Sequence, residues 1–87
     1  MTRPAPTDAR ELDVRELPSA VRHLRIFMHF AALPEGGSLI VVNDHDPQPL
    51  RHQFDYEYPG AYRWTYLESG PAVWRVQIQR APTGGVG

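Results

Sequence analysis

The stretch SLIVVNDHDP, residues 38–47, decides the fold. Its four consecutive apolar residues, 39–42, include three β-branched ones, which predicts a strand in the interior of a sheet. The polar residues 43–46 predict that this strand ends abruptly. Asp46 lies directly before Pro47, a position that disfavours helical geometry, so we expect Asp46 to cap a helix that begins after it.

Upstream of this strand, the sequence predicts a first strand and a helix. Residues 11–17 (ELDVREL) alternate between apolar and polar, as a short strand does. From Pro18 to about Leu33, apolar residues recur every three or four positions and predict an amphipathic helix, which Pro34 and the glycines after it end. The predicted core-facing positions are Ala20, Val21, Leu24, Phe27, Met28 and Ala31. Strand, helix and strand in this order predict a βαβ unit with parallel strands.

Downstream, the sequence predicts a second helix and a hairpin. Leu50 and Phe54 mark a weaker apolar stripe, while residues 61–68 and 73–80 each alternate strongly on either side of Ser69-Gly70-Pro71. The order β-α-β-α-β-β predicts an α+β fold, a two-layer sandwich of a four-stranded mixed sheet with two helices on one face. The residues predicted to face the helices are Tyr62, Trp64, Tyr66 and Trp74. Those predicted to line the open face are Arg63, Arg75, Gln77 and Gln79.

Length and composition predict one small domain over residues 11–80. Residues 1–10 and 81–87 are rich in proline, glycine and small residues and are predicted to be disordered tails. No apolar run approaches the ~20 residues of a membrane span, and no secretory signal is recognisable. We therefore expect a cytoplasmic protein without membrane contact.

The chain contains no cysteine, and its nine basic residues are all arginine. A thiolate nucleophile, a cysteine metal site and a lysine Schiff base are therefore excluded. The sequence also lacks a phosphate loop, a dinucleotide glycine pattern and a Gly-x-Ser-x-Gly elbow, which favours a non-catalytic function. The net charge of −1 argues against nucleic acid as the main partner.

Three polar segments are predicted to meet at one edge of the sheet. The first strand brings Arg15, the first turns of the helix bring Arg22 and His23, and the second strand ends at residues 43–46. The carboxyl ends of parallel strands are where α/β folds tend to bind ligands. This edge is therefore the predicted site.

The chemistry of this edge allows three interpretations. Two imidazoles and one carboxylate would suit zinc or ferrous iron and leave open coordination positions. The same residues would equally form a structural network of turn and cap contacts. A third interpretation is a pocket for a small anion or another ligand near the helix N-termini. The candidate metal or ligand residues are His23, His45, Asp44 and Asp46, and the candidate anion or partner residues are Arg15, Arg22, Arg63 and Arg75.

Four stretches resemble a bacterial domain family of unknown function, DUF2249. They are LDVREL (12–17), RHLRIF (22–27), VVNDHDPQPLRHQF (41–54) and WTYLESGPAVWRVQI (64–78). The resemblance implies the fold of the TusA/SirA-like proteins, whose sulfur-carrying members use a Cys-Pro pair at the start of the first helix. Leu17-Pro18 stands there in this chain, so sulfur relay is not implied. Relatives that occur beside hemerythrin-like and metal–sulfur assembly domains imply a link to metals or to oxidative and nitrosative stress.

The expected function is that of a small, non-catalytic accessory module. It would bind a protein partner through the open sheet face or the polar edge. The alternative is a metal- or small-ligand-binding domain that uses His23 and residues 44–46. The chain is expected to be a monomer or a weak dimer.

Overall fold

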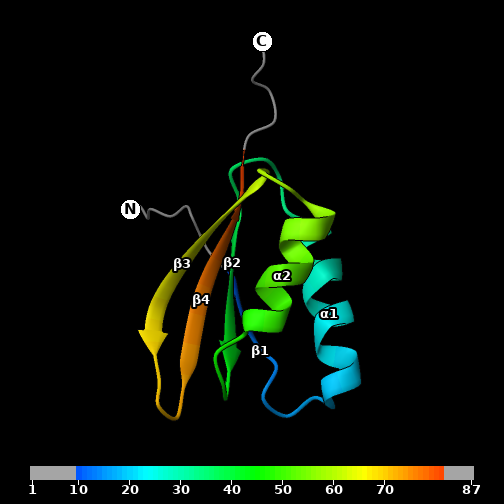
Figure 1. The fold of residues 1–87 in the computed structure, drawn as a ribbon. Coiled ribbons are helices and arrows are strands. Elements are labelled where there is room, and N and C mark those ends of the chain that lie inside the picture. Colours follow the sequence, from blue (N-terminus) through cyan, green and yellow to red (C-terminus); the bar gives the residue numbers. More distant parts are fainter. Residues whose placement is uncertain (1–9, 82–87) are drawn as a thin grey trace, which may run out of the picture.

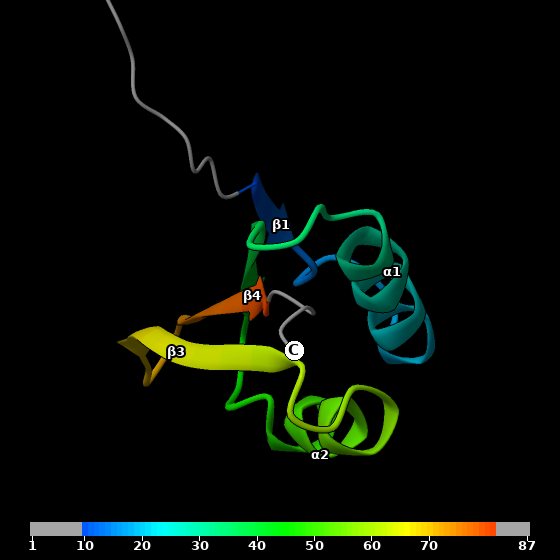
Figure 2. The same cartoon turned by 90° about the horizontal axis from the view of Figure 1, so that it is seen from above.

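The computed structural model describes residues 10–81, and its elements follow the predicted order. The strands are β1 (Arg10–Asp13), β2 (Ser38–Asn43), β3 (Tyr62–Ser69) and β4 (Trp74–Arg80), and the helices are α1 (Ser19–Ala31) and α2 (Gln48–Glu57). Both helices lie on the same side of the sheet (Figure 1), and the view from above separates the helical layer from the strand layer (Figure 2). The prediction of a two-layer α+β sandwich is confirmed.

The four strands lie in the order β1-β2-β4-β3. β1 and β2 are parallel, which confirms the predicted βαβ unit, while β4 is antiparallel to both β2 and β3. The apolar run in β2 is therefore an interior strand, as predicted. Val41 pairs with Leu12 on one side and with Val76 on the other, so these three side chains share one face of the sheet.

The first strand is shorter than predicted, because it ends at Asp13 and not near residue 17. The Asp13 carboxylate accepts a hydrogen bond from the backbone N–H of Arg15 at 3.0 Å, which turns the chain out of the sheet. Val14, just after the strand, remains fully buried. Alternation alone could not detect this turn, since the apolar residues continue through it.

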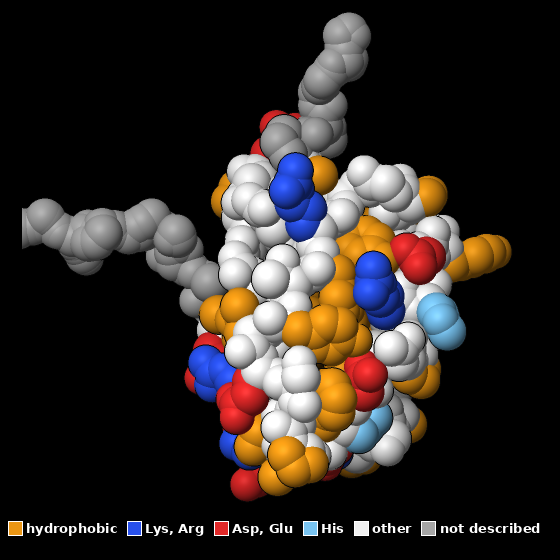
Figure 3. Space-filling view, turned by 60° about the vertical axis from the view of Figure 1, so that its left-hand side comes forward, with side chains coloured by type: hydrophobic (Ala, Val, Ile, Leu, Met, Phe, Trp, Pro, Cys, Tyr) orange, Lys and Arg blue, Asp and Glu red, His pale blue; other side chains and the backbone are white. Residues whose placement is uncertain are grey.

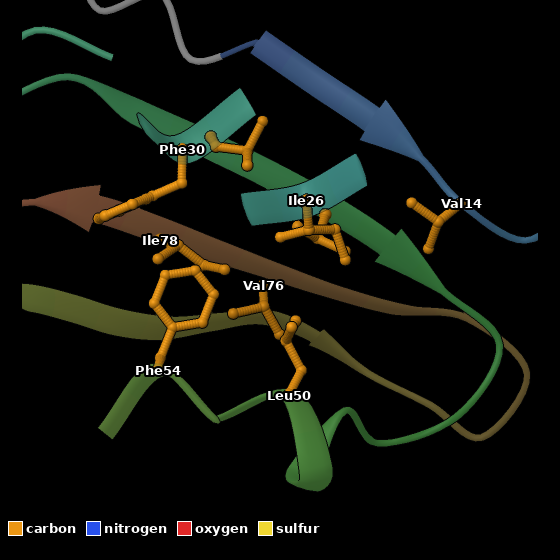
Figure 4. Close-up of a cluster of buried hydrophobic side chains, with 9 residues drawn as sticks. Val14, Ile26, Phe30, Leu50, Phe54, Val76 and Ile78 are labelled. Atoms are coloured by element: carbon orange, nitrogen blue, oxygen red, sulfur yellow. The ribbon is translucent and has the colours of Figure 1, made fainter. Parts of the chain in front are cut away.

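A single apolar core lies between the sheet and the two helices (Figure 4). Phe54 of α2 is at its centre, with its ring centroid 4.4 Å from that of Phe27 and 4.9 Å from that of Phe30. The half-buried Tyr62, Trp64 and Tyr66 pack against this core, as predicted. Trp74, the fourth residue of the predicted aromatic face, contacts the ring of Tyr66 and is not packed against the core cluster. The buried members of the core are Val14, Ile26, Phe30, Leu39, Val41, Leu50, Phe54, Val76 and Ile78.

The predicted core-facing stripe of α1 is wrong for Leu24 and Met28, whereas Phe27 packs against the core as predicted. The fully buried residues of α1 are Ile26 and Phe30, whereas the side chains of Leu24 and Met28 are 62% and 59% exposed. Arg22 lies four residues before Ile26, on the same row of the helix, and reaches into the loop after β2. With Ile26 and Phe30 buried and Arg22 bonded to Asn43 on this side of the helix, the side that carries Leu24 and Met28 faces solvent.

The face of the sheet that no described helix covers is charged and polar, as predicted. Arg75 of β4 forms ion pairs with Glu11 of β1 and with Glu68 of β3. It is also the register partner of Val42, whose side chain is only 3% exposed. We infer that the apolar stem of Arg75 covers Val42. Figure 3 shows this side of the molecule obliquely, with acidic and basic side chains lying against one another.

The described part of the chain extends one residue beyond the predicted domain at each end. Arg10 begins β1, and the backbone N–H of Ala81 donates to the carbonyl of Ala61 at 3.0 Å. The rest of the two predicted tails, 1–9 and 82–87, lies outside the described residues. Neither α1 nor α2, the helices of residues 10–81, is long and apolar enough to cross a membrane.

Candidate functional site

Arg22 is the centre of the polar edge. Its Nε donates to the Leu17 carbonyl at 2.9 Å, and its Nη1 lies 2.9 Å from Asn43 Oδ1 and 3.1 Å from Asp44 Oδ1. Its Nη2 lies 3.0 Å from the Arg15 carbonyl and 3.4 Å from Asp44 Oδ2. A guanidinium has five N–H bonds, and these five contacts match each of them to an acceptor. Arg22 thus joins the loop after β1 to the loop after β2.

Asn43 and Asp44 form the other half of this contact. Asn43, at 5% exposure, is the buried polar residue of the described chain, and its Oδ1 accepts from both Arg22 and the backbone N–H of Asp44. His45 Nδ1 lies 2.8 Å from Asp44 Oδ1. The hydrogen bonds from Arg22 and then from His45 lower the pKa of the Asp44 carboxyl to about 2. Asp44 is therefore ionised at neutral pH.

Arg15 is held by the same type of contact on the other loop. Its Nε and Nη2 lie 2.9 and 2.6 Å from the two carboxylate oxygens of Asp13, in a bidentate pair. These hydrogen bonds lower the pKa of Asp13 to about 2 and raise the pKa of Arg15 above its ordinary value. Both loops at the polar edge are thus stabilised by an arginine and a carboxylate.

His23 does not join the cluster around Asp44. Its Nδ1 lies 2.9 Å from Gln53 Oε1, so the imidazole faces α2. Asp44 and His45 are together, as predicted, but residues 10–81 contain no group of three or more His, Cys, Asp or Glu side chains placed to hold a metal ion. Zinc or ferrous iron at these residues stays a prediction.

Asp46 does not cap α2, contrary to the prediction. The helix begins at Gln48, Pro47 occupies its N-cap, and no side chain bonds to the cap. Asp46 Oδ1 instead accepts from the Tyr66 hydroxyl at 2.7 Å, which ties this loop to β3. Burial, followed by this hydrogen bond, raises the pKa of Tyr66. The proline after Asp46 displaces the cap by one position, and the carboxylate serves a tertiary contact.

The two arginines predicted for the open face differ in their surroundings. Arg75 lies between Glu11 and Glu68, so its charge is already compensated. Arg63 is exposed and forms no ion pair with a residue in the range 10–81. Whether either one binds an anion or a partner stays a prediction.

The outward face of α1 is a feature that the sequence interpretation missed. We use this name for the exposed residues Ala20, Leu24, Met28 and Ala31. Beside this face, between the two helices, lies a shallow hollow of about 330 Å³. Its lining residues are His23, Leu24, Phe27, Gln53, Glu57 and Tyr58. The exposed apolar residues had the spacing of a core stripe, so the signal was present but was assigned to the wrong side of the helix.

A family model described as "Uncharacterized conserved protein (DUF2249)" matches residues 11–80. The chain belongs to the DUF2249 family. No curated protein and no solved structure matches it. The match runs from β1 to β4 and includes both the polar edge and the outward face of α1. It confirms the resemblance recognised in the sequence, while the relation of this DUF2249 domain to the TusA/SirA-like fold stays a prediction.

A second hollow of about 690 Å³ lies at the end of the DUF2249 domain opposite the polar edge. It is lined by the end of α1, the loop before β2, and neighbouring residues of β1, β2 and β4. His29 and Arg10 are its basic lining residues. None of the predicted site residues lines this hollow, which opens beside the first described residue.

Proposed function

We propose that this DUF2249 domain is a non-catalytic protein-interaction module whose docking surface is the outward face of α1. The observation that carries this proposal is the exposure of Leu24 and Met28, at 62% and 59%. They are four residues apart and therefore adjacent on the helix surface. Contiguous apolar side chains on a helix are the anchors of helix-mediated recognition.

The polar edge supports this choice by contrast. Arg22 and Asp44 satisfy each other, and so do Arg15 and Asp13. A ligand that bound there would have to displace contacts that hold the two loops together. The outward face of α1 has no comparable contacts to lose, because its large side chains meet solvent. The favourable term on binding would be the removal of apolar surface from water.

Site-specific photo-cross-linking tests this function. A benzophenone amino acid at Met28 should cross-link the domain to another polypeptide chain in the cells that express it, a second copy of the domain included. The matched control is the same amino acid at His52, which is exposed on α2 and lies outside the hollow. Cross-linking at position 28 should disappear when Leu24 is replaced by arginine. Equal cross-linking at positions 28 and 52, or none at either, would contradict the proposal.

A further inference from the structure

The outward face of α1 is apolar across its full width. At about 100° per residue, its four residues fall within an arc of about 80°. Val21 and Phe27, both half-buried, extend this arc by about 20° on either side. The helix, SAVRHLRIFMHFA, contains no acidic residue. A partner therefore meets an uninterrupted apolar strip whose specificity must come from its rims.

The two rims of this strip carry opposite charges. On one side, Arg25 lies about 60° beyond Met28 around the helix and is exposed. On the other side, across the 330 Å³ hollow, lies the exposed Glu57 of α2. Neither residue forms an ion pair within residues 10–81. The strip is therefore bordered by one uncompensated cation and one uncompensated anion.

This arrangement is self-complementary, and we infer that the partner of the proposed interaction module is a second copy of the same chain. A two-fold axis parallel to α1 places the basic rim of each copy on the acidic rim of the other. Arg25 of one copy then meets Glu57 of its mate, and the contact occurs twice. A two-fold axis perpendicular to α1 would instead place the basic rim of one copy against the basic rim of the other, and the acidic rim against the acidic rim. Arg25, the middle residue of Ser19–Ala31, would then face its own copy. The parallel arrangement is therefore favoured.

The hollow supports the same arrangement. Met28 lies on the Arg25 side of the strip, so in the parallel pair it projects toward the hollow of the other copy. That hollow, about 330 Å³, has Leu24, Phe27 and Tyr58 in its lining. Methionine is unbranched and adapts to irregular apolar spaces. The contact thus combines two methionine insertions with two ion pairs.

The size of this contact predicts weak association. A helix of 13 residues is about 20 Å long, so one face and its rims bury roughly half of the ~800 Å² per partner of a standard interface. We therefore expect a Kd between about 1 µM and 1 mM. This inference rests on the proposed function, because it names the partner of the same surface.

Sedimentation equilibrium of the full chain tests the inference between about 10 µM and 1 mM. The apparent mass should rise from 9.9 kDa toward twice that value. Leu24→Arg should keep the chain at the lower mass. Arg25→Glu and Glu57→Arg should each weaken association about threefold to tenfold, and the double variant should restore it, because exposed ion pairs contribute this much. His52→Arg, an equally exposed change on α2, should leave association unchanged.

The outcomes separate the two proposals. A chain that stays at the lower mass at every concentration overturns the second-copy inference, while a position-28 cross-link to a different protein would still support the interaction module. A dimer that is insensitive to Leu24→Arg also overturns the inference, as does a double charge variant that associates no better than the single ones. Circular dichroism spectra that match the wild type are the check that each variant is folded.

Discussion

The polar edge and the outward face of α1 both include residues of α1, but they differ in how many contacts their side chains already make within the domain. At the polar edge, the five N–H bonds of Arg22 are matched to five acceptors. The buried Asn43 accepts one of these hydrogen bonds and a second one from the backbone N–H of Asp44. At the outward face, Leu24 and Met28 are more than half exposed. Residues of the type that usually bind ligands thus hold the fold together. Residues of the type that usually form a core are exposed to solvent.

This contrast shows that residue type predicts chemistry only after the contacts of each side chain are known. Arg15 and Arg22 near the helix N-termini suggest an anion site in a sequence, but in the structure each arginine is paired with a carboxylate. An apolar stripe suggests a core, but α1 carries two such stripes and only one side of it meets the sheet. A helix with apolar residues on two sides is typical of a protein that buries the second side against a partner.

The sharpest test of this contrast compares two apolar residues of α1. Replacing Phe30 by alanine should lower the free energy of unfolding by about 3–5 kcal/mol, because the ring is fully buried and packs against Phe54 and Tyr58. Replacing Leu24 by alanine should change it by less than about 0.5 kcal/mol at low protein concentration. Urea unfolding followed by circular dichroism measures both. Equal losses would show that Leu24 is also part of the core.

A second comparison uses two arginines of the same helix. Arg22→Met should destabilise the domain by about 2–3 kcal/mol, since the buried Asn43 oxygen loses one of its two donors and the carbonyls of Arg15 and Leu17 lose the Arg22 donor. Arg25→Met should have almost no effect, because Arg25 is exposed and forms no ion pair with a described residue. Urea unfolding midpoints of the two variants show whether Arg22 contributes to stability. An Arg22→Met variant as stable as the wild type would show that Arg22 has no structural role.

The strands were predictable because their periodicity leaves little choice. Alternation has a period of two, so the aromatic residues of β3 all lie on one face of the sheet and the polar residues between them lie on the other. Since the polar residues belong on the solvent-facing side, the aromatic residues had to face the helices. The apolar run of β2 required burial on both faces, and Arg75 provides cover on the open one. The turn at Asp13 and the tertiary role of Asp46 depend on partners far away or on side-chain geometry, which periodicity does not encode.

The rotation of α1 was not predictable from periodicity alone. Ile26 and Phe30 form a second apolar row, and Phe27 lies between this row and the outward face of α1, so the two apolar surfaces are continuous. With Ile26 and Phe30 facing the sheet, Arg22 contacts Asn43, and a contact between residues 21 positions apart is not encoded in the periodicity of the helix. The family match likewise establishes membership of DUF2249 without indicating which side of α1 faces the sheet.

The smallest effect is expected from acid. The folded pKa of Asp44 is about 2, below its ordinary value of 3.8, so its contacts stabilise the domain above pH 4 and lose this contribution as the pH falls toward 2. Urea midpoints measured between pH 5 and pH 2 should therefore fall less steeply for Asp44→Asn than for the wild type. Asp13→Asn should behave in the same way, because Arg15 lowers the pKa of Asp13 to about 2. Identical acid profiles in all three proteins would show that neither arginine–carboxylate contact contributes to stability. The contrast between the polar edge and the exposed apolar face would then rest on the hydrogen bonds that Arg22 donates to Asn43 and to the carbonyls of Arg15 and Leu17.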